Sequence, residues 1–262
     1  MTTAARVQSA EAAHFYTKTG EPMHFIERSD GQGTRPTTLR DAKKLGLLPS
    51  PTSILKVLRA PQLEAWKIEM ACLSVLTAPR KEGEALDAFV ERVLHTERQQ
   101  DEQAQKARDL GTRIHDAIAG VLMGAAECPV ELAPFVAPAI AEMHLFGKVA
   151  ATEEVVCGER CAGRLDARFF DEQVQRVTVV DIKTTSNPPL KGSWLEHKLQ
   201  LSFYAEALPC THAIQTANVY ISTKTPGIVT VDTHKDWRQT YECGFKPLLD
   251  YWCFANNYDP AK

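Results

Sequence analysis

From residue 151 onward, apolar and polar positions alternate with a period of two, which is the period of a β-strand. Three such runs follow one another closely, and two shorter ones come later. The pattern predicts five strands, over residues 153–157, 160–170, 176–183, 217–222 and 228–231. The third run contains Val177-Thr178-Val179-Val180, which is β-branched throughout and therefore typical of a buried strand.

Helical periodicity dominates the chain before residue 150 and returns between and after the strands. Ser50 stands before Pro51 and an apolar face, a pattern typical of a helix cap. Pro134 and Pro138 are expected to interrupt the chain ahead of a helix that ends near residue 149. The other predicted helices cover residues 51–58, 61–77, 84–121, 194–208 and 236–254.

Residues 1–50 are mixed in character, and Phe15-Tyr16 and His24-Phe25-Ile26 bracket a predicted hairpin. The expected organisation is an N-terminal extension over residues 1–50, a helical region over 51–150 and a core over 151–262. We expect the core and the helical region to pack as one globular unit. The predicted fold class is α/β, with a central sheet flanked by helices.

The composition is that of a globular protein, since 262 residues with 44% hydrophobic content suffice for one sizeable α/β domain. No stretch approaches the roughly 20 continuous apolar residues that cross a bilayer, and no signal-peptide core follows Met1. We therefore expect a soluble, cytoplasmic protein without a membrane partner. Seven cysteines without a C-x-x-C motif predict reduced thiols, and Cys157 and Cys161 fit buried or half-buried strand positions better than a metal site.

An acid and a base lie two residues apart where the strand over 176–183 ends. Asp181 and Lys183 share one face because side chains alternate along a strand, while Ile182 points into the core. An isolated pair of acidic and basic side chains is commonly an ordinary salt bridge. Asp166 adds a second carboxylate fifteen positions earlier, on a similar strand. Two carboxylates and a lysine can hold a hard divalent cation and steady a reacting phosphate.

Polar side chains on predicted helices accompany this set. Gln200 and Tyr204 are four residues apart and hence on one helix face. The same pattern is also typical of partly buried helix residues whose side chains form hydrogen bonds with nearby backbone groups. His115 follows Gly111-Thr112 on an earlier helix, and a lone helical histidine is more often structural.

The order of these motifs resembles the PD-(D/E)XK nuclease superfamily, specifically its RecB-like branch, which includes phage exonucleases and the mitochondrial genome maintenance exonuclease. The similarity covers most of the chain, because residues 49–55 and 63–67 look like the opening of that branch and residues 35–46 look like what precedes it in phage and prophage members. Pro51 is a departure, where the family more often has valine, and we expect it to affect only a local turn. The resemblance implies a restriction-endonuclease-like core, with a central mixed β-sheet flanked by helices and an N-terminal helical region.

The resemblance also implies metal ligands. Asp166, Asp181, the carbonyl of Ile182 and His115 would bind one or two ions of Mg²⁺ or Mn²⁺, and nitrogen ligation suits Mn²⁺. Glu153 and Glu154 compete for a further acidic position, because only one of two successive strand residues can face the metal. Glu153 is favoured, since Glu153-x-x-Val156 fits the family pattern better.

Lys183 would orient or deprotonate the attacking water and stabilise the developing negative charge. Burial would lower its pKa and the carboxylates would raise it, and the sequence leaves open which effect is larger. Gln200 and Tyr204 would contact DNA or brace the surroundings of Lys183.

Further candidates for DNA contacts lie around this set. Arg164 and Arg168 flank Asp166 at even spacing and would contact phosphates, although solvated arginines give the same pattern. Lys191 belongs to the same local basic patch, which matters because the net charge of −3 argues against broad, nonspecific coating of nucleic acid. Trp194 would stack on a base or pack in the core.

The sequence thus predicts a metal-dependent DNA exonuclease that acts on single-stranded or duplex ends in phage or prophage recombination, replication or repair. A recombination or replication protein is a candidate partner. One alternative is a structure-specific endonuclease with the same metal core. Another is a noncatalytic DNA-binding module that has kept the fold.

Overall fold

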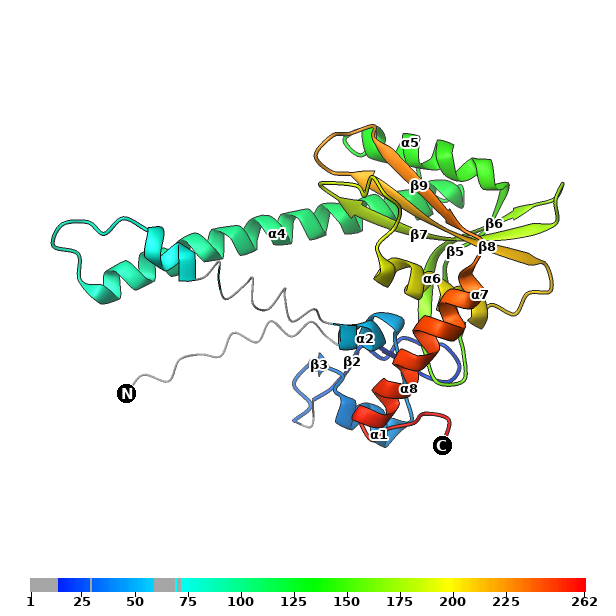
Figure 1. Ribbon diagram of the computed structural model, residues 1–262, viewed down its shortest axis with the longest axis horizontal. Coiled ribbons are helices and arrows are strands. Elements are labelled where there is room, and N and C mark those ends of the chain that lie inside the picture. The colour runs from blue at the N-terminus through cyan, green and yellow to red at the C-terminus, as the bar shows by residue number, and fades with distance from the viewer. Residues whose placement is uncertain (1–13, 29, 59–68, 70–71) are drawn as a thin grey trace.

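A five-stranded sheet, with the order β5-β6-β7-β8-β9, forms the centre of the computed structural model (Figure 1). The structure describes residues 14–28, 30–58, 69 and 72–262, without the side chains of residues 94–104. The strands are β5 (Lys148–Cys157), β6 (Ala162–Asp171), β7 (Arg176–Thr185), β8 (Ala213–Ser222) and β9 (Val229–His234). Strands β7 and β8 are parallel and the other neighbours are antiparallel, so the sheet is mixed. All five predicted strands are confirmed.

Helices cover both faces of this sheet (Figure 1). On one face, α4 (Leu86–Leu122) and α5 (Ala133–Met143) pack against Val180 and Ile182. On the other, α6 (Leu195–Ala207) and α8 (Lys246–Ala255) pack against Val177 and Val179. The β-branched run of β7 is therefore buried from both sides, as its composition predicts, and Ile182 lies in the core as expected. Helix α6 connects β7 to β8, because parallel neighbours require a crossover.

Short elements build the N-terminal part of the described chain: β1 (Phe15–Tyr16), β2 (Phe25–Glu27), β3 (Thr34–Pro36), α1 (Leu39–Leu45), β4 (Leu48–Pro49), α2 (Pro51–Leu55) and η1 (Lys56–Leu58). The predicted turn near residue 20 closes with a bridge between Tyr16 and Pro22. The extended partner of β1 is β4, however, and β2 pairs with β3. This long-range pairing was missed because no local pattern specifies it.

The predicted cap at Ser50 is confirmed, because its side chain accepts a hydrogen bond from the Ser53 N–H at the start of α2. Helix α4 joins the predicted helical stretches over residues 84–121 into one helix that extends well beyond the sheet (Figure 1). Residues 63–67, which carry part of the family resemblance, lie outside the described part of the chain, as does most of the predicted helix over 61–77.

The helix expected to end near residue 149 ends at Met143, and η2 (His144–Phe146) follows it. The reason is tertiary: Lys148 and Val149 pair with Phe170 and Phe169, so β5 begins five residues earlier than predicted. Both prolines lie within α5 instead of interrupting the chain before it. Pro134 is in the first turn, where no intrahelical N–H bond is needed, whereas Pro138 removes one helical hydrogen bond.

The C-terminal segment is helical throughout, as predicted, from α7 (Trp237–Thr240) through a π-helical turn, η3 (Tyr241–Phe245), into α8. Cys157 is half-buried and Cys161 is buried, which agrees with the interpretation of both as packed thiols. None of the helices in the described ranges has the length and apolar character needed to cross a membrane.

Candidate active site

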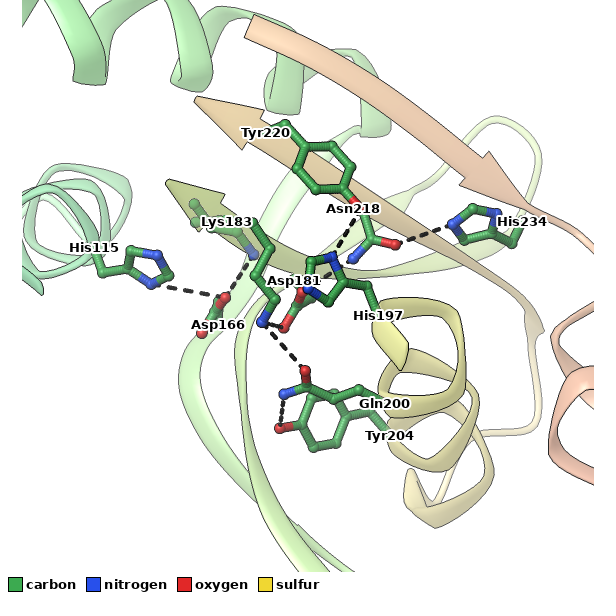
Figure 2. Close-up of polar contacts among 11 residues, drawn as sticks. His115, Asp166, Asp181, Lys183, His197, Gln200, Tyr204, Asn218, Tyr220 and His234 are labelled. Atoms are coloured by element: carbon green, nitrogen blue, oxygen red, sulfur yellow. Dashed lines mark hydrogen bonds and ion pairs between the residues drawn. The ribbon is translucent and has the colours of Figure 1, made fainter. Parts of the chain in front are cut away.

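Strands β6 and β7 separate near the middle of the sheet, and the candidate site lies where they part. Their last paired residues on this side are Ala167 and Val180, so Asp166 lies opposite Asp181 just beyond the ladder. Asp166 Oδ2 accepts a hydrogen bond from the Ile182 N–H at 2.6 Å (Figure 2). The Asp166 side chain thus supplies the hydrogen-bond acceptor that the Ile182 N–H no longer finds on the β6 backbone. The two predicted carboxylates lie side by side.

The carboxylate of Asp181 is buried, with 2% of the residue exposed, and both of its oxygens have partners. Lys183 Nζ donates to Oδ1 at 2.8 Å, and Asn218 Nδ2 donates to Oδ2 at 3.0 Å. Asp181 and Asn218 are direct neighbours in the β7–β8 ladder. The predicted pairing of Asp181 with Lys183 on one face is confirmed.

Asn218 is held in one orientation by its two partners. A carboxylate only accepts hydrogen bonds, so the amide nitrogen must face Asp181 and the amide oxygen must face His234. His234 Nε2 lies 3.1 Å from that oxygen and is therefore the donor. Burial lowers the pKa of His234, which favours the neutral ring. Neither residue was predicted from the sequence, where the only signal was an amide within an apolar run.

Gln200 and Tyr204 brace Lys183 from α6. Gln200 Oε1 accepts from Lys183 Nζ at 3.2 Å, and Gln200 Nε2 donates to the Tyr204 hydroxyl at 2.9 Å. Both side chains are buried, and burial also raises the pKa of Tyr204 well above its usual value. Of the expected roles, this arrangement favours bracing over contact with DNA.

Gly163 is required where β6 passes α2 and α6. A Cβ atom there would lie 2.8 Å from both Pro51 Cδ and Tyr204 Cε1. Pro51 is therefore part of the packing beside the site. The expectation that it affects only a local turn is wrong, because the proline ring lies against β6.

His115 reaches the site from α4, with Nδ1 at 3.8 Å from Asp166 Oδ2 (Figure 2). Burial lowers the pKa of His115, so the neutral ring is favoured and the contact is not an ion pair. The helix can approach this closely because of Gly111, where a Cβ atom would lie 2.6 Å from Thr184 Oγ1 of β7. The Gly111-Thr112-x-x-His115 pattern thus has a packing explanation.

A cleft of about 430 Å³ opens between α4 and the β5–β6 strands. Its lining includes His115, Asp166, Glu153 and Arg164. Glu153 has a φ of 52°, in the left-handed region, and its carboxylate forms an ion pair with Arg164 at 2.7 Å. Glu154 is not among the lining residues and forms an ion pair with Arg168, also at 2.7 Å. Of the two competing glutamates, Glu153 is therefore the one that shares a cleft with Asp166.

Negative charge is crowded in this site. Burial, and then the charge of Asp181, raise the pKa of Asp166 to about 7. Burial alone would lower the pKa of Lys183, but Asp181 and Asp166 outweigh it, so that pKa is raised. Burial also raises the pKa of Glu153, against the effect of Arg164. The question left open by the sequence is thus answered for Lys183: the carboxylates have the larger effect.

The donors fit a hard divalent cation by their chemistry, since they are carboxylate oxygens joined by one neutral imidazole. Over the described ranges, no three side chains of His, Cys, Asp or Glu already converge as a set of metal ligands. Glu153 in particular is turned towards Arg164, so it would have to leave that ion pair to reach a metal.

Three predicted DNA contacts lie outside the cleft, namely Lys191, Trp194 and Arg168, which is ion-paired with Glu154. Lys191 is exposed in the segment that precedes α6. Trp194 stands directly before α6 with 45% of its surface exposed, so the alternative that it packs in the core is wrong. Its indole ring instead contacts His197 and Tyr220, two residues that were not predicted from the sequence.

Comparisons with known proteins add little to this geometry. No family model matches the sequence, and no curated protein matches it. A solved structure described as "Crystal structure of SSO0001" is similar to part of the chain, with 18% sequence identity and a TM-score of 0.30. The similarity covers 50% of this chain and 64% of that one, so the matched region spans less than two thirds of its length.

Proposed function

We propose that this protein is a metal-dependent DNA exonuclease that hydrolyses phosphodiester bonds, with a restriction-endonuclease-like core of the PD-(D/E)XK superfamily and its RecB-like branch. The observation that supports the proposal is the convergence of Asp166, Asp181 and Lys183 where β6 leaves β7, within reach of His115. A phage or prophage role in recombination, replication or repair is part of the proposal.

Asp166, Asp181, the carbonyl of Ile182 and His115 would hold one or two ions of Mg²⁺ or Mn²⁺, and Glu153 would join them on leaving Arg164. Such a metal, when bound, supplies Lewis acidity and lowers the pKa of a bound water. The crowded carboxylates favour this interpretation: burial, and then the charge of Asp181, raise the pKa of Asp166 to about 7, and a cation would offset that charge.

Lys183 is suited to stabilising charge on the phosphate. Its raised pKa keeps the ammonium protonated at neutral pH, so it serves better as a hydrogen-bond donor than as a base. Asp181 and Gln200 hold two of its three possible hydrogen bonds, which leaves one for a non-bridging phosphate oxygen. Arg164, beside the cleft, would contact a neighbouring phosphate.

The test is incubation of end-labelled single-stranded and duplex DNA with the protein and Mg²⁺ or Mn²⁺. We expect D181A and K183M to lower the cleavage rate by about 100-fold or more. D250A and K148M are matched controls, because Asp250 and Lys148 form surface ion pairs away from the cleft. If the parent protein leaves every substrate intact, or D181A cuts as well as the parent, the proposal is wrong.

Covalently closed circular DNA separates the two modes of cleavage, since an exonuclease needs an end. Loss of circles would favour the structure-specific endonuclease. Binding that persists in EDTA without any cleavage would favour the noncatalytic DNA-binding module.

A further inference from the structure

We propose that Trp194, supported by His197 and Tyr220, forms a stacking surface for an unpaired nucleobase of the strand whose phosphate lies at Lys183. We call these three residues the aromatic surface, in which Trp194 is exposed and Tyr220 is a fully buried support. The inference rests on the proposed function, because it names the form of DNA that the site accepts.

The first observation is exposure. Trp194 is 45% exposed, and Leu190 and Leu195 nearby are 97% and 60% exposed. Among the described residues, Trp194 belongs to none of the hydrophobic clusters of the core. A large ring of this kind in water is suited to binding, because base–aromatic stacking is a main source of affinity for single strands.

The second observation is the arrangement of the rings. The indole of Trp194 meets His197 at 5.3 Å between ring centroids and 84° between planes, and Tyr220 at 5.5 Å and 88°. Neither ring therefore stacks flat on the indole. A nucleobase would stack parallel to the indole, and neither His197 nor Tyr220 occupies that position.

The third observation is position. Tyr220 is the direct neighbour of Lys183 in the β7–β8 ladder, and its hydroxyl lies 2.9 Å from His197 Nδ1. Figure 2 shows His197 and Tyr220 beside Asp181 and Lys183. The aromatic surface is thus adjacent to an ammonium group, and a nucleotide carries both a flat base and an anionic phosphate. Ring and charge are complementary to the two parts of one nucleotide.

The fourth observation is that the aromatic surface and the site are held by one set of polar contacts. The Ser193 N–H donates to Asp232 Oδ2 at 2.5 Å, which fixes the chain just before Trp194. Asp232 is the ladder neighbour of Asn218, and Asn218 in turn holds Asp181. A contact surface fixed in advance loses less conformational entropy on binding.

The base is inferred to be unpaired for two reasons. A base inside a duplex has both faces covered by its neighbours, so only an unpaired base or a terminal pair offers a free face. Lys183 is half-buried between Asp181 and Gln200, so the phosphate has to reach into the protein. A single strand can do this without carrying a complementary strand along.

The experiment measures binding, not cleavage. Fluorescence anisotropy of a labelled single-stranded oligonucleotide is recorded with Ca²⁺, an oxygen-binding cation, in place of Mg²⁺, and the oligonucleotide is checked for integrity. We expect W194A to weaken binding about 10-fold or more, and W194F to retain most of the affinity because it keeps an aromatic face. L195A is the matched control, since Leu195 is the next residue and is also apolar and exposed, and it should bind as the parent does.

A scan with single abasic nucleotides identifies the stacking itself. For the parent protein, one position should lose affinity when its base is removed, and W194A should show no such position. The inference is overturned if W194A binds like the parent, if the parent shows no position-specific loss, or if the parent binds no oligonucleotide. It is also overturned if W194A lowers the affinity for a blunt duplex as much as the affinity for a single strand, since Trp194 would then cap a terminal base pair.

The result of the binding experiment can be distinguished from the result of the cleavage test of the proposed function. A position-specific loss that depends on Trp194, in a protein that cleaves no DNA with Mg²⁺ or Mn²⁺, would support the aromatic surface and overturn the nuclease. Cleavage that depends on Asp181, together with unchanged binding by W194A, would do the reverse. A thermal unfolding curve of each variant confirms that it is folded.

Discussion

Asn218 is one of two residues that fix the orientation of the Asp181 carboxylate, the other being Lys183. It donates to Oδ2 of the carboxylate and accepts from His234, so N218A removes the hydrogen bond of two buried polar atoms, Asp181 Oδ2 and His234 Nε2. We expect a loss of about 1 to 3 kcal/mol in the free energy of unfolding. We also expect slower metal-dependent cleavage, because one oxygen of Asp181 is then unrestrained. Urea unfolding and the cleavage rate measure the two effects.

Gln215 offers a matched control on the same strand. Its side chain donates to Thr178 at 3.2 Å, and this buried pair spans β8 and β7 as Asn218 and Asp181 do. Q215A should therefore lower stability by a similar amount and leave the cleavage rate of the folded protein unchanged. Equal slowing by both variants would mean that Asn218 acts only through stability.

At the scale of elements, the approach of α4 to β7 depends on Gly111. Alanine at this position would gain up to about 1 kcal/mol of helix propensity. Its Cβ would however lie 2.6 Å from Thr184 Oγ1, and overpacking of this kind costs about 1 to 3 kcal/mol. We expect G111A to be less stable and less active, because α4 and His115 are pushed away from Asp166. Thermal unfolding and cleavage assays measure both.

The double variant G111A/T184A tests this reasoning. Removing Oγ1 leaves only the Cβ of residue 184, at 3.7 Å from the added methyl group, which is an ordinary contact. Stability should then return to the level of T184A or above it. A fully stable and active G111A would show that the helix is not tightly constrained here.

Helix α1 has a pH-dependent cap. Hydrogen bonds from Arg35, and then from Thr38, hold the pKa of Asp41 well below its usual range. A carboxylate with a depressed pKa stabilises the fold above its unfolded pKa of about 4, and this contribution is lost as the pH falls further. The melting temperature of the parent should exceed that of D41N at pH 7, and the difference should shrink towards pH 3. R35M should remove most of this pH dependence, and a difference constant with pH would contradict the explanation.

Local pattern was sufficient for elements that local chemistry determines. The β-branched run over 177–180 and the cap at Ser50 are both where they were predicted. The end of α5 at Met143 was not predictable in this way, because it depends on the pairing of Lys148 with Phe170, which lies 22 residues further along the chain.

The candidate site likewise combines residues that local pattern predicts with residues that depend on long-range pairing. Asp181 and Lys183 follow from the two-residue period of one strand. Asn218 and His234 depend on the register of three strands, which no single segment of sequence specifies. Trp194 was identified as a candidate, but its exposure depends on how the segment before α6 is anchored to Asp232.

For the whole molecule, a bound metal should raise the melting temperature by mass action, and EDTA should reverse the increase. We expect Mn²⁺ at about 100 times its dissociation constant to add about 3 kcal/mol of stability, or several degrees. D181A should abolish the increase. Thermal unfolding with and without metal measures it.

Glu153 and Glu154 form a matched pair for the same assay, because both are ion-paired with an arginine of β6 and only Glu153 lines the cleft. E153Q should reduce the metal-induced increase, and E154Q should leave it unchanged. The opposite result would assign the ligand to Glu154, and no increase in the parent protein would argue against a metal site.

Helix α4 connects the site to a distant part of the molecule. Its 37 residues form one helix, roughly 55 Å long, which touches β7 at Gly111 and continues far past the sheet. Between Leu86 and Leu110 the helix contains neither proline nor glycine, the residues at which helices commonly kink. The same continuous helix therefore carries both the outer turns and His115, whose Nδ1 lies 3.8 Å from Asp166 Oδ2.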